Sequence, residues 1–92
     1  MGKTLLRPEM VPSLEIGDCL MEMDRFTKKY KIYKLVEKSE NYAYGEVIAS
    51  TDDTNIGYTC GMDLMAHAFH KNCSWLTYYL PAGKVLYGQR TP

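Results

Sequence analysis

The chain has 92 residues, enough for one domain, and its hydrophobic content of 46% excludes a chain that is disordered throughout. Eleven basic and eleven acidic side chains cancel, which excludes a strong attraction of the whole chain to nucleic acid or to anionic lipid. No apolar run approaches the roughly 20 residues of a membrane-spanning helix, so we expect no membrane partner. The first residues lack the apolar run of a secretion signal, and three cysteines without a framework spacing suit a reducing compartment. The sequence therefore predicts a cytoplasmic protein.

Residues 1–13 are predicted to be an irregular N-terminal arm, because Pro8 and Pro12 are incompatible with a continuous helix or a central strand. The remaining residues, 14–92, are predicted to form a single small β-rich domain. Its strands are expected where apolar and polar side chains alternate between turn-forming residues, which is the case at residues 19–23, 29–36, 42–49, 58–60, 74–80 and 85–88. The turn between the second and third of these strands is placed at residues 38–41.

One helix is predicted, from Met62 to about residue 71. At 100° per residue its apolar side chains share one face, which is formed by Met62, Met65, Ala66 and Phe69. The opposite, polar face carries His67 and His70. Several short strands with one short helix predict a mainly β (α+β) fold, either a small SH3-like barrel or a strongly bent antiparallel sheet.

The stretch "IGDCLMEMDRFTKKYKIYKLVEKSENYAYGEV" resembles the opening of small SH3-like β-barrel proteins of the kind often encoded by bacteriophages. In that family a "GD" pair begins the first strand and a "YKI" strand pairs with the next one. The resemblance covers about residues 14–49 and is a pattern of strands rather than a signature of activity. It implies a small barrel, a phage origin and a location in the host cytoplasm.

The hairpin of residues 25–49 carries the main candidate surface. With the turn at residues 38–41, Ile32 is expected opposite Val47 on the core side, and the next residue, Tyr33, is expected outside. Six of the eleven basic residues fall between positions 25 and 38. The outer face is open to three interpretations: a solubilised strand face, a protein-binding surface or a platform for nucleic acid. The protein-binding candidates are Lys29, Lys31, Tyr33, Tyr42 and Tyr44, and the nucleic-acid-binding candidates are Arg25, Lys28, Lys29 and Lys31.

A second group of side chains has the chemistry of zinc ligands: Cys60, His67, His70 and Cys73. Their spacing matches no established zinc finger, and the two histidines lie on the polar face of the predicted helix. We therefore predict no metal and no cofactor. No nucleophile elbow, phosphate-binding loop or paired-carboxylate motif is present in the sequence, so no catalytic residues are predicted and the protein is expected not to be an enzyme.

The abundance of tyrosine, eight of 92 residues, combined with the lack of a catalytic motif, favours a non-enzymatic module that binds a protein partner. Together with the phage resemblance, it suggests an inhibitor of a host or defence protein. One alternative is a small nucleic-acid-binding barrel that uses the basic and aromatic hairpin of residues 25–49. Another is a homo-oligomeric structural unit.

Overall fold

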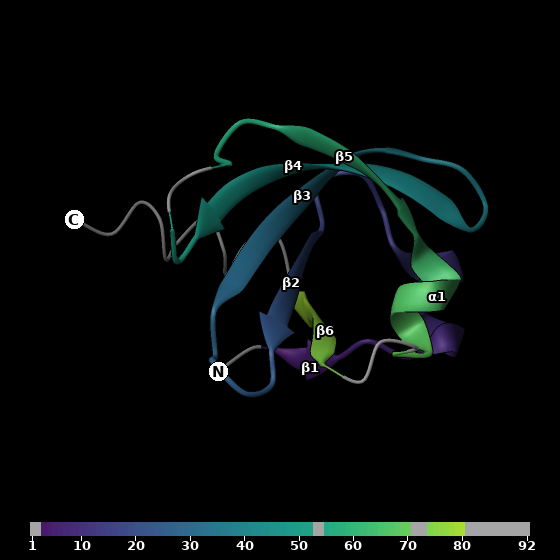
Figure 1. Cartoon of the computed structure of the whole chain (residues 1–92). Coiled ribbons are helices and arrows are strands. Elements are labelled where there is room, and N and C mark those ends of the chain that lie inside the picture. The colour runs from purple at the N-terminus through teal and green to yellow at the C-terminus, as the bar shows by residue number, and fades with distance from the viewer. Residues whose placement is uncertain (1–2, 53–54, 71–73, 81–92) are drawn as a thin grey trace.

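The computed structural model describes residues 3–52, 55–70 and 74–80. Within them the protein is mainly β, with one short α-helix and one 3-10 helix (Figure 1). The elements, in chain order, are β1 (Thr4–Leu5), η1 (Pro8–Ser13), β2 (Cys19–Asp24), β3 (Tyr30–Lys38), β4 (Tyr42–Ser50), β5 (Thr59–Asp63), α1 (Leu64–Ala68) and β6 (Trp75–Leu80). The strand predicted at residues 85–88 lies outside the described residues.

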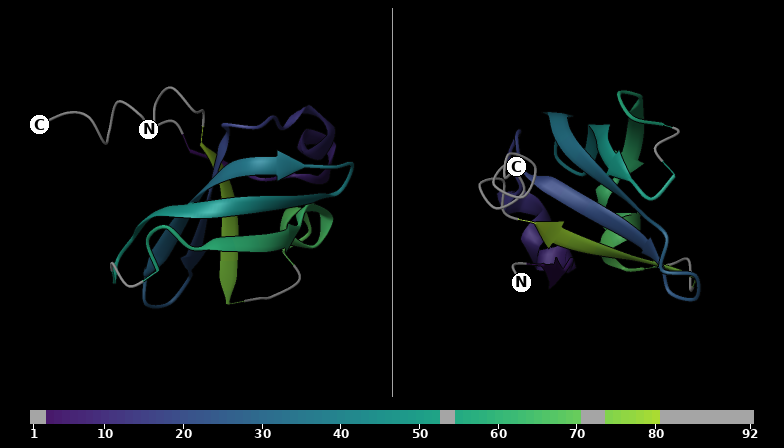
Figure 2. Two further views of the ribbon diagram at one scale, coloured as in Figure 1. Left: turned by 90° about the horizontal axis from the view of Figure 1, so that it is seen from above. Right: turned by 90° about the vertical axis from the view of Figure 1, so that its left-hand side faces the viewer.

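All six strands belong to one antiparallel sheet with the order β1-β6-β2-β3-β4-β5. The sheet is strongly curled, so that β6 runs across the direction of β4 and β5 when seen from above (Figure 2). The predicted mainly β class and bent antiparallel sheet are confirmed. The closed barrel is not, because β1 and β5 are edges of the sheet and do not pair with each other in the described part of the chain. Helix α1 follows β5 at this gap and packs against η1, β4, β5 and β6.

The N-terminal arm is part of the folded core, so the prediction of an irregular arm is wrong for residues 3–13. Thr4 and Leu5 pair with β6. Leu6 and Val11, in the same arm, have no exposed surface. The two prolines fit this structure because a 3-10 helix can begin at Pro8 and contain Pro12 while needing few backbone N–H donors.

The register of the β3–β4 hairpin also differs from the prediction. Ile32 lies opposite Ala49, and Tyr33 lies opposite Val47, so a register shift falls between these neighbouring residues. A second shift follows Leu35. Each irregularity of this kind adds a residue to one strand and exchanges the two faces beyond it. As a result Tyr33 and Leu35 face the core with exposures of 7% and 0%, whereas Ile32 is only half-buried.

The α-helix is shorter than predicted, because the residues before Leu64 continue β5. Asp63 is the N-cap of α1, and its carboxylate accepts hydrogen bonds from the backbone N–H groups of Met65 and Ala66. The helix ends at Ala68, and His70 has a left-handed φ of 53°. No helix among the described residues has the length and apolar character needed to cross a membrane.

The core fills the inside of the curled sheet. It is built from Leu6, Val11, Leu14, Leu20, Tyr33, Leu35, Ala43, Val47, Met62, Leu64 and Ala68. Every described element other than β1 and β6 supplies at least one of these side chains, and Met10, Met65 and Tyr79, the last of these on β6, pack around them. The arm and the helix therefore act as covers for an interior that the sheet does not enclose by itself.

Cys19, at the start of β2, makes the stability of the fold depend on pH in the alkaline range. Burial raises the pKa of its thiol from 9.0 to about 11, while nearby Lys34 opposes the shift. Unfolded chains release this proton near pH 9, whereas folded chains hold it to about pH 11. The contribution of the protonated thiol to the free energy of unfolding is therefore fully present below pH 9 and is lost as the pH rises from 9 to 11. We expect Cys19→Ala to flatten the decline of unfolding free energy between pH 9 and 11. Urea melts across this range, with the exposed Cys60→Ala variant as control, measure the effect. An unchanged decline in Cys19→Ala would contradict the assignment.

Candidate functional site

Two tyrosines project from the outer face of β4. Side chains alternate along this strand, so that Ala43, Gly45 and Val47 face the core while Tyr42 and Tyr44 face outward. The two residues are 46% and 44% exposed. Their centroids lie 5.8 Å apart with an interplanar angle of 82°, which is the edge-to-face geometry that aromatic pairs prefer. The pair is thus ordered although both rings are open to solvent.

Gly61 on the neighbouring strand β5 holds the first of these rings in place. It lies directly opposite Tyr44. A Cβ atom at position 61 would collide with the hydroxyl group of Tyr42, and it would lie 3.1 Å from the Cζ atom of the same ring. The ring of Tyr42 therefore lies across the backbone of β5, where only glycine leaves enough space. This contact restricts the rotamers of Tyr42 in addition to its contact with Tyr44.

A hollow of about 290 Å³ adjoins the two tyrosines. Ile16, which is 65% exposed, forms part of its wall. This isoleucine sits in a turn that is closed by a 2.9 Å hydrogen bond from Glu15 N to the carboxylate of Asp18 and by the left-handed conformation of Gly17. We call Ile16, Tyr42, Tyr44 and this hollow the tyrosine surface. Its lining residues are Ile16, Glu37, Lys38, Ser39, Tyr42, Ala43 and Tyr44.

The structure brings together only two of the five predicted protein-binding residues, Tyr42 and Tyr44. Lys29 is exposed in the connection between β2 and β3, and Lys31 is half-buried within β3. Tyr33 lies in the core, so the prediction that it faces outward is wrong. The register shift beside it turns its side chain toward the core. Sequence reasoning missed Ile16, because nothing in a local pattern shows that the turn before β2 lies beside the turn after β3.

The predicted nucleic-acid-binding residues divide between two places. Arg25, Lys28 and Lys29 are exposed in the β2–β3 connection, whereas Lys31 belongs to β3. Between the first two cations lies Phe26, which is 77% exposed and which the sequence analysis did not single out.

The backbone of this connection is ordered by Asp24. Its carboxylate accepts hydrogen bonds from the N–H groups of Phe26 at 2.8 Å and Thr27 at 3.1 Å. These two bonds lower the pKa of Asp24, which therefore stays ionised at neutral pH. Lys28, which directly follows Thr27, adopts a left-handed φ of 67° that completes the turn. The exposed phenylalanine is thus presented by a defined loop.

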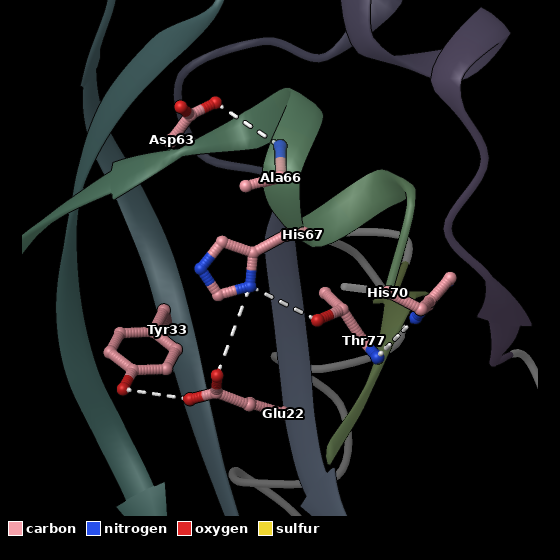
Figure 3. A network of polar contacts seen from close by, with 7 residues as sticks. All are labelled: Glu22, Tyr33, Asp63, Ala66, His67, His70 and Thr77. Carbon is pink, nitrogen blue, oxygen red and sulfur yellow. Dashed lines mark hydrogen bonds and ion pairs between the residues drawn. The ribbon is translucent and has the colours of Figure 1, made fainter. Parts of the chain in front are cut away.

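A chain of polar contacts runs through the inside of the curled sheet (Figure 3). The hydroxyl of Tyr33 donates to Glu22 at 3.4 Å, and the other carboxylate oxygen of Glu22 lies 3.8 Å from Nδ1 of His67. The same nitrogen shares a 3.1 Å hydrogen bond with the hydroxyl of Thr77. Burial, followed by the charge of Glu22, raises the pKa of Tyr33 far above its ordinary value. The contacts join β2, β3, α1 and β6 and leave Tyr33 as a neutral donor.

Both histidines belong to this interior and not to an outward polar face, so that part of the sequence prediction is wrong. His70 receives a hydrogen bond from the N–H of Thr77 at Nδ1 and donates from Nε2 to the carbonyl of Leu6 at 2.9 Å. Both of its ring nitrogens are therefore occupied by the backbone. Among the residues that the structure describes, no three His, Cys, Asp or Glu side chains are grouped to hold a metal ion. Cys60 is exposed on β5, and Cys73 lies outside the described residues.

Comparisons with known proteins give no match: no family model fits the chain, and no curated protein or solved structure is significantly similar to it. The resemblance of residues 14–49 to SH3-like phage proteins therefore stays a prediction. The tyrosine surface combines ordered aromatic rings, an exposed aliphatic side chain and a hollow, which are the components of a contact site for another macromolecule.

Proposed function

We propose that the protein is a non-enzymatic binding module that contacts a protein partner through the tyrosine surface. The observation that supports this proposal is the exposed pair of Tyr42 and Tyr44, held between their mutual contact and Gly61 beside a hollow. Aromatic side chains supply much of the affinity at protein interfaces. Because these rings are already ordered, binding loses less side-chain entropy than it would for freely rotating tyrosines.

The hollow suits an apolar side chain of the partner. The exposed Ile16 and the two tyrosine rings offer apolar contact, while Glu37 and Lys38 place opposite charges at the same site. An apolar anchor in a hollow surrounded by polar groups is the usual arrangement at the centre of a protein interface. A module of this kind acts by occupying the partner's surface and needs no catalytic group. The resemblance to small phage proteins favours an inhibitor of a host or defence protein in the host cytoplasm.

A second candidate function, nucleic-acid binding, is favoured by Phe26. Its ring is 77% exposed between Arg25 and Lys28, so that a ring for stacking on a base lies beside cations for phosphates. The site is small and the chain has no net positive charge. We therefore rank it below the tyrosine surface, where several features from separate turns and strands coincide.

We expect Tyr42→Ala and Tyr44→Ala each to weaken partner binding by about 2 kcal/mol or more, because each removes an ordered anchor. Their cost in folding should be about 1 kcal/mol or less, since both rings are half exposed. A photo-crosslinking amino acid at position 44 identifies the partner in extracts of the native host, and calorimetry with the purified partner then measures both variants.

Phe26→Ala is the matched control, because it removes an exposed aromatic ring outside the tyrosine surface. Binding should be unchanged in this variant. If the crosslinker captures nucleic acid at position 26 and no protein at position 44, the second candidate replaces the first. Binding to a single-stranded oligonucleotide should in that case weaken steeply as salt is raised.

A further inference from the structure

Strand β5 forms an edge of the sheet in the described part of the chain. Of the two edge strands, β1 has two residues and β5 has five. The pairing of β5 with β4 is regular from Tyr42 opposite Asp63 to Glu46 opposite Thr59, without a register shift. In the described part of the chain no strand lies on the other side of β5. The register of this edge is therefore regular enough to accept a further strand.

The direction of the backbone groups of β5 follows from two hydrogen bonds. Leu64 N donates to Asn41 O, and Val47 N donates to Tyr58 O. Because bonding to a given neighbour alternates along an antiparallel strand, the even-numbered residues of β5 bond to β4. The N–H and C=O groups of Thr59 and Gly61 consequently point away from β4, toward the free edge.

From Thr59 to Met62 this edge carries none of the charged side chains or prolines by which proteins usually prevent edge pairing. An irregularity lies just before the strand, where Gly57 N and Tyr58 O both bond to Val47 and Gly57 has a left-handed φ. Residues 55–62 contain no charged side chain and no proline. The carboxylate of Asp63, at the end of the strand, is held by the N–H groups of Met65 and Ala66 as the cap of α1. Ile56 and Tyr58, just before the strand, are 45% and 65% exposed. An uncharged edge flanked by exposed apolar side chains is typical of a pairing surface.

We propose that β5 pairs antiparallel with β5 of a second copy of this chain. A two-fold axis through the edge places each free N–H opposite a free C=O, and an uncharged strand does not repel its own copy. In the favoured register, Thr59 of each copy lies opposite Gly61 of the other. This register uses only the free backbone groups. The register centred on Gly61 would also need the carbonyl of Asp63, which as an N-cap accepts the first hydrogen bond of α1.

Pairing at the edge leaves the outer face of the sheet open. The two tyrosine surfaces would then lie on one continuous sheet, and a partner with two binding sites would gain affinity through avidity. The inference does not depend on the proposed function, because the pairing uses the backbone of β5 and its readout is the mass of the particle. Failure of partner binding and failure of dimer formation are thus separate results.

The register predicts a specific crosslink. Cys60 would face its counterpart as a non-hydrogen-bonded pair, with Cα atoms about 4.5 Å apart, within the range of disulfides. Mild oxidation of the full chain carrying Cys73→Ser should produce a covalent dimer, since Cys60 is exposed and Cys19 is buried. The same chain with Cys60→Ser added should give no covalent dimer. A missing crosslink in the first chain would overturn this register.

Sedimentation equilibrium of the full chain tests the pairing itself. We expect a concentration-dependent dimer for the unmodified chain and for the control variants Thr59→Val and Cys60→Ser. Thr59→Pro removes an outward N–H without removing a bond to β4, and Cys60→Lys places two like charges opposite each other. Both variants should be monomeric at concentrations where the controls are dimeric.

Circular dichroism and thermal melts check that the variants are folded, and two variants acting by different routes keep the test decisive if one of them unfolds. Dimers in both Thr59→Pro and Cys60→Lys would overturn the proposal. A second result would also overturn it: a monomeric unmodified chain, together with a Thr59→Pro variant that no longer binds the crosslinked partner protein. In that case β5 would pair with a strand of the partner and not with a second copy of this chain.

Discussion

Tyr33→Ala is expected to lower the free energy of unfolding by about 3–5 kcal/mol, and Ile32→Ala by only about 1–2 kcal/mol. Tyr33 is 7% exposed and packs in the core opposite Val47, so its removal leaves a cavity between β3 and β4. Its neighbour is half-buried and loses less contact. The order of the two effects is the reverse of the one that the sequence alone predicts.

Tyr33→Phe separates packing from hydrogen bonding at this position. The variant keeps the ring and removes the 3.4 Å hydrogen bond to Glu22, so we expect a cost of about 1 kcal/mol. Urea melts of the three variants measure these values under one set of conditions. A greater loss in Ile32→Ala than in Tyr33→Ala would show that the core side of β3 carries the even-numbered residues and that the register shifts are absent in solution.

The strands were predictable because their signals are local. Alternating side chains and turn-forming residues located β2, β3, β4 and β6 to within a few residues, and Val47 of β4 was also predicted to face the core. The face of β3 was not, because the shifts beside Tyr33 and after Leu35 depend on how two strands fit together and leave no mark on the alternation of one strand. The helix was predicted too long because the apolar period begins at Met62, which packs in the core from β5.

The candidate site shows the same division. Tyr42 and Tyr44 were predicted to face outward together, since they alternate with small residues on one strand. Gly61 and Ile16 were missed because their contributions are tertiary: one is a glycine beneath a ring from the neighbouring strand, and the other belongs to a distant turn. The histidines were misplaced for a related reason. A helical wheel distinguishes the faces of a helix, but it does not show that the polar face of α1 points into a curled sheet containing Glu22.

Leu6 carries the second large expected effect. Its side chain has no exposed surface, and its backbone is bonded on both sides: the N–H donates to Thr77 O at 2.9 Å, and the carbonyl accepts from His70 Nε2 at 2.9 Å. We therefore expect Leu6→Ala to lower the free energy of unfolding by about 2–5 kcal/mol. Val11→Ala, in η1 of the same arm, should also be destabilising because this side chain is fully buried.

The control for Leu6→Ala is Glu9→Ala, which changes an exposed side chain of the same arm and should alter stability by no more than about 0.5 kcal/mol. Chemical melts give the free energies, and hydrogen exchange adds a local measure, because the amide of Leu6 should exchange as slowly as those of the central strands. An irregular arm in water would show fast exchange at Leu6 and the same small effect for both variants. The gap between β5 and β1 makes the expected loss large: the sheet does not close around its core, so the arm and α1 must exclude water there.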